Sequence, residues 1–264
     1  MFDFKGGMSY LAGIRGFVQN LVIESAVLQR NDSSIMRILG IDSSIPQGSV
    51  ALLENERILA QANIQKNSTY SDQILGVVDQ VLGEAETNLE GVEGFCLTVG
   101  PGSFTGLRVG ASLVKGLVLA TEKPFIGVDT LEATALLGTP TENQICAILD
   151  ARKKEVYSAR FRLTEGTLER LSPDRAMPPE QLCQEIAEPT VFVGSGLDTY
   201  SDLLSSKLES NFLLAPKKNT STVAACAARL ARERFDTEKC FDLGALTIKY
   251  IRQSEAELKF AQTS

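Results

Sequence analysis

The part of this chain best suited to chemistry is a glycine-rich segment at residues 100–110. It reads Gly-Pro-Gly-Ser-Phe-Thr-Gly-Leu-Arg-Val-Gly and separates an apolar strand at 95–99 from a predicted helix. Glycine allows close approach to the backbone, and Ser103 can cap a helix whose first N–H groups attract an anion. The segment is not a P-loop, since no Lys follows the glycines, and it lacks the dinucleotide-binding fingerprint. An anion cradle and a structural turn are therefore both open.

Two aspartates could take part in phosphate chemistry, because each stands where a predicted strand meets its turn. Asp42 follows a strand at 38–41, and Asp150 follows a strand at 145–149. Carboxylates in such positions can hold magnesium and water against a nucleotide. Aspartate is also common in turns, where its side chain accepts backbone hydrogen bonds.

Histidine is absent from all 264 residues, which excludes Ser-His-Asp and Cys-His catalysis and histidine-ligated metals within this chain. The five cysteines are far apart and form no CxxC pair, which indicates reduced, buried thiols. A net charge of −7 argues against a chain that wraps nucleic acid by itself. No apolar run approaches the roughly 20 residues of a membrane span, so we expect a cytoplasmic protein with no membrane contact.

Regular patterning begins only at Met36, and glycines interrupt the scattered apolar positions before it. We predict that residues 1–35 are an extension outside the fold and that Met36 is the natural start. After it the chain reads as two related halves, each with three short strands followed later by an apolar strand that runs into Gly-x-Gly. The predicted strands are 38–41, 49–53, 57–64 and 95–99, then 145–149, 155–161, 167–171 and 190–193. Helices are predicted near 72–85, 103–120, 131–137, 179–186, 198–208 and 222–234.

This order is typical of the α/β architecture shared by actin, Hsp70 and sugar kinases (ASKHA). We predict a duplicated fold with two lobes, each a mixed sheet flanked by helices. The N-terminal lobe would span 36–138 and the C-terminal lobe 139–264. A shared fold does not assign a function.

Five segments, in the same order along the chain, resemble the TsaB (YeaZ) family of bacterial proteins needed to make threonylcarbamoyladenosine in tRNA. They read MRILGIDSS at 36–44, the glycine-rich segment at 100–110, PFIGVDTLEA at 124–133, DARKKEVY at 150–157 and YIR at 250–252, followed by Ala256-Glu257. The resemblance thus covers nearly everything after residue 36.

The resemblance implies a non-catalytic subunit. In that family TsaB binds and orders TsaD, which holds a metal through histidines and transfers the threonylcarbamoyl group, and the ATPase TsaE joins them. It implies no catalytic residue, metal or cofactor in this chain, since ATP and the metal are held by the partner subunits, and tRNA is reached only through the complex. A chain without histidine agrees with this division.

The resemblance also implies a partner surface. In the family, the first two helices of the N-terminal lobe pack against the equivalent helices of TsaD, or of a second TsaB, as a four-helix bundle. Here these are the helices that begin at Asp72 and Ser103, and the second helix is apolar on two sides. The sequence leaves open which side faces outward. Candidate contacts are Ile74, Val77, Val78, Val81, Leu107, Val109, Leu113 and Leu117.

Two other function classes are alternatives. An ATP-dependent phosphotransferase or ATPase of the same superfamily would use Asp42 and Asp150, and steady ATP hydrolysis by the isolated chain would identify it. A peptidase is the weaker alternative, because no nucleophile–base pair supports it.

Overall fold

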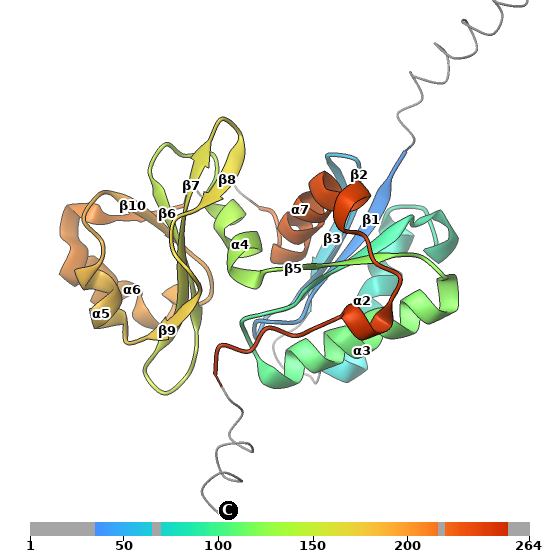
Figure 1. Ribbon diagram of the computed structural model, residues 1–264, viewed down its shortest axis with the longest axis horizontal. Coiled ribbons are helices and arrows are strands. Elements are labelled where there is room, and N and C mark those ends of the chain that lie inside the picture. Colours follow the sequence, from blue (N-terminus) through green and yellow to red (C-terminus); the bar gives the residue numbers. More distant parts are fainter. Residues whose placement is uncertain (1–34, 65–69, 216–219, 253–264) are drawn as a thin grey trace, which may run out of the picture. The chain divides into compact units, whose positions relative to one another are not determined.

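The computed structural model describes residues 35–64, 70–215 and 220–252, with the side chains of 70–72 left aside. The chain divides into a unit at 1–35 and a compact unit at 36–264. The predicted extension at 1–35 lies, apart from Ile35, outside the described residues. All of the elements labelled in Figure 1 belong to the second unit.

The first sheet has five strands in the order β3-β2-β1-β4-β5. β1, β2 and β3 form an antiparallel meander, and β4 and β5 continue the sheet parallel to β1. β1 and β4 are buried along nearly their whole length, as expected of central strands with both faces covered. The bounds are Arg37–Asp42 for β1, Ser49–Glu54 for β2, Arg57–Asn63 for β3, Gly94–Thr98 for β4 and Phe125–Val128 for β5.

Helices from distant parts of the chain cover the two faces of this sheet (Figure 1). α2 (Tyr70–Glu84) and α3 (Phe104–Thr121) pack on the face that carries Leu39, and α7 (Val223–Glu238) packs on the face that carries Ile38. A Cβ at Gly40 would lie 2.4 Å from the carbonyl oxygen of Ala224. Glycine at this strand position therefore lets α7 lie directly against β1.

The second sheet repeats the first, and its order is β11-β10-β6-β7-β8. β8 pairs with residues 161–164 of β7, and β9 pairs with residues 156–158 of the same strand. β6, β7 and β8 form the meander, and β10 and β11 run parallel to β6. α4 (Thr130–Ala135) contributes to the core on one face, while α5 (Pro179–Gln184) and α6 (Leu197–Leu208) cover the other. The strand bounds are Gln144–Asp150, Val156–Thr164, Thr167–Arg170, Arg175–Met177, Thr190–Val193 and Phe212–Leu214 for β6 to β11 in order.

The repeated sheet order confirms the predicted duplication and the ASKHA-like α/β fold. Every strand and helix expected from the periodicity is present, with ends shifted by a few residues. The strands that the pattern missed are β5, β9 and β11, which are only three or four residues long.

After α7, the chain continues as a segment that we call the C-terminal strap, residues 242–252, which contacts both halves of the fold. Just before it, Cys240 pairs with Phe125 at the edge of the first sheet. The amide of Lys249 donates a 2.7 Å hydrogen bond to the carbonyl of Val99, and Arg252 donates one of 3.1 Å to the carbonyl of Ala151. The strap therefore joins the first sheet to the β6–β7 turn of the second.

Candidate functional site

The glycine-rich segment at 100–110 is a structural turn, because the chain's own backbone fills the space around its glycines. A Cβ at Gly102 would lie 2.3 Å from the carbonyl oxygen of Ser44, and a Cβ at Gly106 would lie 2.0 Å from that of Ser43. The amide of Ser103 donates to the carbonyl of Ser44 at 2.6 Å. The glycines thus dock the start of α3 onto the end of β1, and this packing explains them without a ligand.

Asp42, which a nucleotide-binding site would need to expose, is enclosed in the fold. Its side chain is fully buried, and it is not among the residues that line the cleft described below. Oδ1 accepts hydrogen bonds from the amide and hydroxyl of Ser44, at 3.0 and 2.5 Å, and from the Thr98 hydroxyl at 2.7 Å. Burial raises the pKa of this carboxyl, although those hydrogen bonds oppose the shift. Asp42 therefore holds the turn after β1.

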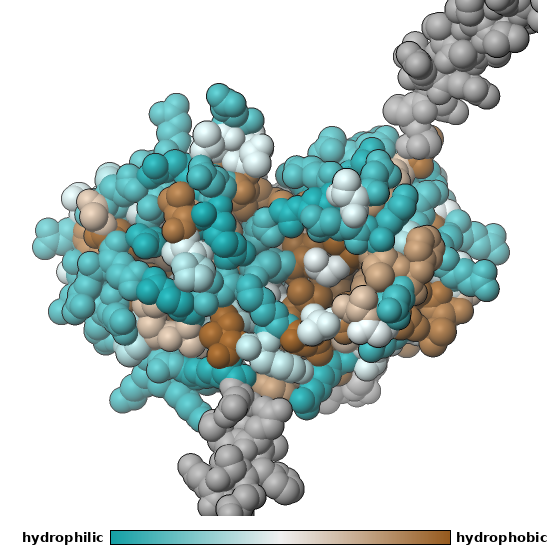
Figure 2. Space-filling model, viewed as in Figure 1, coloured by the Kyte–Doolittle hydropathy of each residue, from teal (hydrophilic) through white to brown (hydrophobic). Residues whose placement is uncertain are grey.

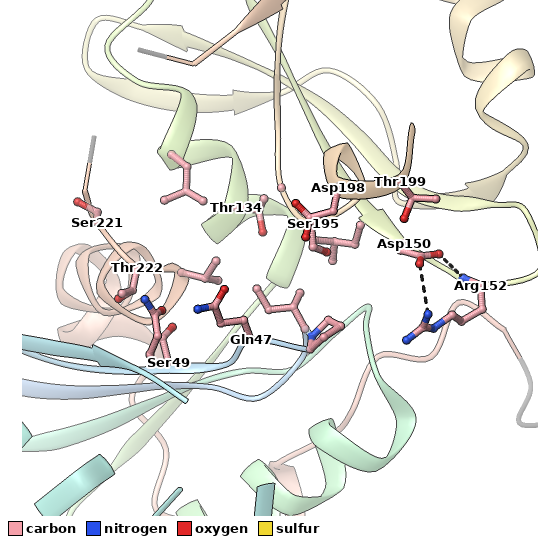
Figure 3. Close-up of a pocket in the computed structure, with 17 residues that line it drawn as sticks. Gln47, Ser49, Thr134, Asp150, Arg152, Ser195, Asp198, Thr199, Ser221 and Thr222 are labelled. Atoms are coloured by element: carbon pink, nitrogen blue, oxygen red, sulfur yellow. Dashed lines mark hydrogen bonds and ion pairs between the residues drawn. The ribbon is translucent and has the colours of Figure 1, made fainter. Parts of the chain in front are cut away.

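Asp150 does lie at a cleft, which is formed between the two sheets and has a volume of about 460 Å³ (Figure 3). Its carboxylate accepts a 2.8 Å hydrogen bond from the amide of Arg152 and lies 3.6 Å from the Arg152 guanidinium. The other polar lining is mostly hydroxyl and amide groups, including Gln47 and Ser195. In the described part of the chain, no three potential metal-ligating side chains come together.

The second Gly-x-Gly also packs on the chain itself. A Cβ at Gly194 would lie 2.3 Å from the carbonyl oxygen of Ile148, and Gly194 has a φ of +109°. This glycine permits the turn from β10 into α6 and the close packing on β6. Its position therefore needs no ligand to explain it.

The structure divides the eight predicted partner contacts into two groups. Five of them belong to the hydrophobic core and are less than a tenth exposed: Ile74, Val78, Val81, Leu107 and Leu117. The other three, Val77, Val109 and Leu113, are half-buried at the surface of the same helices. The partner role of all eight stays a prediction.

Two large apolar residues that the sequence pattern did not single out are more exposed than any of these. Leu75 in α2 is 55% exposed and Leu119 in α3 is 72% exposed. Both lie beside, rather than within, the apolar stripes that mark the core face, so periodicity gave no signal for them. Figure 2 shows apolar side chains gathered along α3 toward its C-terminal end.

A groove of about 530 Å³ runs between the exposed sides of α2 and α3. Its lining residues are Ile74 and Leu75 from α2 and Thr105, Arg108, Val109, Ser112 and Leu113 from α3. Among the described helices, α3 alone has the length and mean hydropathy, 1.2, of a membrane span. It packs on a sheet, however, with seven buried residues and a Ser103 cap. Thus α3 carries apolar side chains, such as Leu119, beyond those that its core contacts bury.

Three glycines lie on the exposed surface of the same two helices. Gly76 and Gly83 in α2 and Gly116 in α3 are exposed, and a Cβ at each would meet no atom within 4 Å. Glycine inside a helix costs about 0.5–1 kcal/mol relative to alanine. Within the described part of the chain, packing gives no reason for this loss of stability.

Comparison with known proteins agrees with the topology. Residues 57–260 match the family model described as TsaD: tRNA N6-adenosine threonylcarbamoyltransferase. The chain is also similar to two proteins named tRNA threonylcarbamoyladenosine biosynthesis protein TsaB. The one from Bacillus subtilis is 25% identical over 86% of this chain and 99% of its own length. The one from Escherichia coli is 33% identical over 64% of this chain and 75% of its own.

The chain belongs to the TsaB (YeaZ) family. The solved structure of YeaZ from Pseudomonas aeruginosa superposes with a TM-score of 0.65 and 24% identity, covering 82% of this chain and all of that one. The predicted resemblance and fold class are thereby confirmed. The match to the TsaD family model also means that this chain, a member of the TsaB family, is similar to that model over its residues 57–260.

Proposed function

We propose that this chain is the non-catalytic subunit that binds and orders TsaD in the complex that forms N6-threonylcarbamoyladenosine next to the anticodon of tRNA. The names of the TsaB relatives support the pathway. The observation that carries the subunit role is the surface of α2 and α3, where exposed leucines, an apolar groove and unexplained glycines occur together.

The residues that a catalytic role would use argue for a partner role instead. Asp42, which a phosphotransferase would need beside magnesium, is buried in a turn. Asp150 faces a cleft but is engaged by Arg152. The two glycine-rich turns close onto the chain's own backbone. We therefore assign no metal or cofactor to this subunit, and we expect ATP and the metal of the complex to be held by its partners.

The partner face that we propose is narrower than the eight predicted contacts and uses the exposed parts of α2 and α3. Helices pack with their axes about 8–10 Å apart, and the shorter distances require small residues at the crossing. Gly76 and Gly116 supply such positions, and Leu75, Val109 and Leu113 supply the apolar contacts around them. We propose that helices of TsaD pack here, or helices of a second copy when TsaD is absent. TsaE would join the assembled pair, tRNA would be reached through it, and the complex would act in the cytoplasm.

The test is gel filtration with light scattering of this chain alone and mixed with TsaD from the same organism, with a threonylcarbamoyl-transfer assay on tRNA. We expect a stoichiometric complex and transfer that requires both chains. Leu113→Asp should prevent the complex while leaving the monomer folded, and Lys207→Asp, on the exposed side of α6, should not. ATP turnover by the isolated chain without any complex would instead support the phosphotransferase.

A further inference from the structure

Three side chains form a compact group beside the groove between α2 and α3, at the N-terminal end of α3. The rings of Phe104 and Tyr250 are stacked, with centroids 4.1 Å apart and planes 11° from parallel. The guanidinium carbon of Arg108 lies 4.6 Å from the centroid of Phe104 and 5.8 Å from that of Tyr250. Arg108 Nε donates a 3.1 Å hydrogen bond to the Tyr250 hydroxyl. We call this group the Arg108 platform.

The platform is held in place from two directions. Phe104 and Arg108 are one turn apart at the start of α3, which is capped by Ser103. Tyr250 comes from the C-terminal strap, where the Lys249 amide bonds the carbonyl of Val99 and Arg252 bonds that of Ala151. A guanidinium between such supports loses little conformational entropy when it binds a further group.

The charge of Arg108 has no counter-ion among the side chains that the structure describes. Among the residues whose side chains the structure describes, no carboxylate lies within ion-pair distance of it, and its neighbours are two rings and a hydroxyl. Elsewhere in the same part of the chain, Arg37, Arg170 and Arg234 each pair with a carboxylate. Because Nε is already engaged by Tyr250, the two Nη groups are the atoms left for a planar, two-oxygen acceptor.

We infer that the Arg108 platform receives an aspartate or glutamate side chain of the partner helix that fills the groove. This inference rests on the proposed function, because it assigns one more contact to the same face. Arg108 lines the groove together with Val109 and Leu113, so the acceptor must lie about one helical turn from the apolar side chain that enters the groove. Arginine and tyrosine beside an apolar pocket are the composition of an interface hot spot.

The inference makes the contact charge-dependent, which apolar packing alone would not. Ionic strength screens an exposed ion pair, whereas it leaves buried apolar contacts nearly unchanged. Affinity for the partner should therefore fall as salt is added, and most of that fall should depend on Arg108.

The experiment is titration calorimetry of the full-length chain with purified TsaD at 50, 150 and 500 mM salt. Four variants are compared with the wild type: Arg108→Met, Arg108→Lys, Tyr250→Phe and the control Lys207→Met on α6. We expect Arg108→Met to weaken binding about tenfold or more at 50 mM salt and to flatten the salt dependence. Arg108→Lys should keep the salt dependence but lose affinity, and Tyr250→Phe should lose only a few-fold. Unchanged circular dichroism shows that each variant is folded.

Three outcomes would overturn the inference in distinguishable ways. If Arg108→Met binds TsaD like Lys207→Met, with the same salt dependence, while Leu113→Asp does not bind, the groove is the interface and the platform has no carboxylate partner. If the wild-type chain shows no binding to TsaD at any salt concentration, the proposed function fails and the inference fails with it. If Arg108→Met weakens self-association of this chain but not TsaD binding, the acceptor belongs to a second copy and the stated partner is wrong.

Discussion

Asp42 and Gly106 both lie near the junction between β1 and α3, and each has a residue type that suits chemistry. In the fold, both serve packing: the carboxylate gathers three hydrogen bonds, and the glycine lets a helix end approach a carbonyl oxygen. The second oxygen of Asp42, Oδ2, is buried without a hydrogen-bond partner in the described structure. Burial raises the pKa of this carboxyl, and Oδ2 makes no hydrogen bond in the described structure that would oppose the shift.

Substitutions at Asp42 should separate packing from charge. Asp42→Asn keeps the Oδ1 acceptor and removes the ionisable group, so we expect a change in unfolding free energy below about 1 kcal/mol. Asp42→Ala leaves the buried donors of Ser44 and Thr98 without an acceptor and should cost about 2–3 kcal/mol. Urea unfolding at pH 7 measures both. Equal losses in the two variants would mean that the ionised form is what the turn requires.

Gly106→Ala should be destabilising, because its new methyl carbon would lie 2.0 Å from the carbonyl oxygen of Ser43. Relief of this clash requires α3 to move away from β1, and we expect a loss of about 1–3 kcal/mol. Thermal unfolding of the isolated chain tests this. The matched control is Gly83→Ala on α2, where the added carbon meets nothing and the midpoint should rise slightly.

At the scale of elements, α3 combines a core side with an exposed side to which we propose that the partner binds. Its buried residues include Leu107, Val114 and Val118, and the opposite side carries Ser112, Gly116 and Leu119. A substitution on the exposed side should therefore affect the unfolding free energy of the isolated chain and its affinity for TsaD in different ways.

Gly116→Ala should raise the unfolding free energy of the isolated chain by about 0.5–1 kcal/mol, because alanine is the better helix former and the site is open. Gly116→Leu should leave the monomer folded but weaken TsaD binding on the order of tenfold, because its bulk would hold the partner helix away. Differential scanning calorimetry and titration calorimetry measure the two effects. Full TsaD affinity in Gly116→Leu would place the crossing elsewhere on α2 and α3.

The elements that the sequence predicted correctly show either a clear period or turn residues that mark their ends. The helix pattern at 103–120 corresponds closely to α3, and the Gly-x-Gly after residue 193 marks the end of the four-residue β10. Short strands such as β9 carry too few residues for alternation to appear. Periodicity also shows that a face is apolar but not what covers it. This is why neither the packing of α7 on β1 nor the exposure of Leu75 could be predicted.

At the scale of the molecule, one cluster of charges ties together parts of the chain that are far apart in sequence. Asp129 follows β5 of the first sheet, Arg170 and Asp174 belong to the second, and Lys249 belongs to the strap. Lys249 Nζ lies 2.8 Å from Asp129 and also bonds Asp174. Arg170 lies 3.1 Å from Asp129 and pairs with Asp174 as well. Two carboxylates are thus held together by two cations.

The two carboxyl groups of this cluster titrate very differently. Burial, together with the hydrogen bond and the charge of Asp129, raises the pKa of Asp174 to about 6. Burial would also raise the pKa of Asp129, but hydrogen bonds from Asp174 and Lys249 and the charge of Arg170 lower it instead. Of the two carboxyls, Asp174 is therefore the one that takes up a proton first as pH falls.

This proton gives the stability of the free chain a pH dependence. Between about pH 4 and pH 6 the folded state binds more protons at Asp174 than the unfolded state, so the free energy of unfolding falls as pH rises through this window. Asp129 has a lowered pKa, so its contribution to the free energy of unfolding is lost only when the pH falls below the ordinary range of carboxyl pKa values. We expect Asp174→Asn to reduce the fall in thermal midpoint between pH 5 and pH 7. Identical pH profiles for variant and wild type would contradict the assignment.

The face of the first sheet that α7 covers must stay bare until nearly the whole chain has left the ribosome. β5 ends at Val128 but α7 ends only at Glu238, and the residues between them take on the order of ten seconds to synthesise. For that time, Ile38 and Leu53, which are fully enclosed in the finished fold, present apolar surface to water. The nascent chain is thus a natural client for chaperones, and truncation before α7 should yield an aggregating fragment rather than a smaller folded domain.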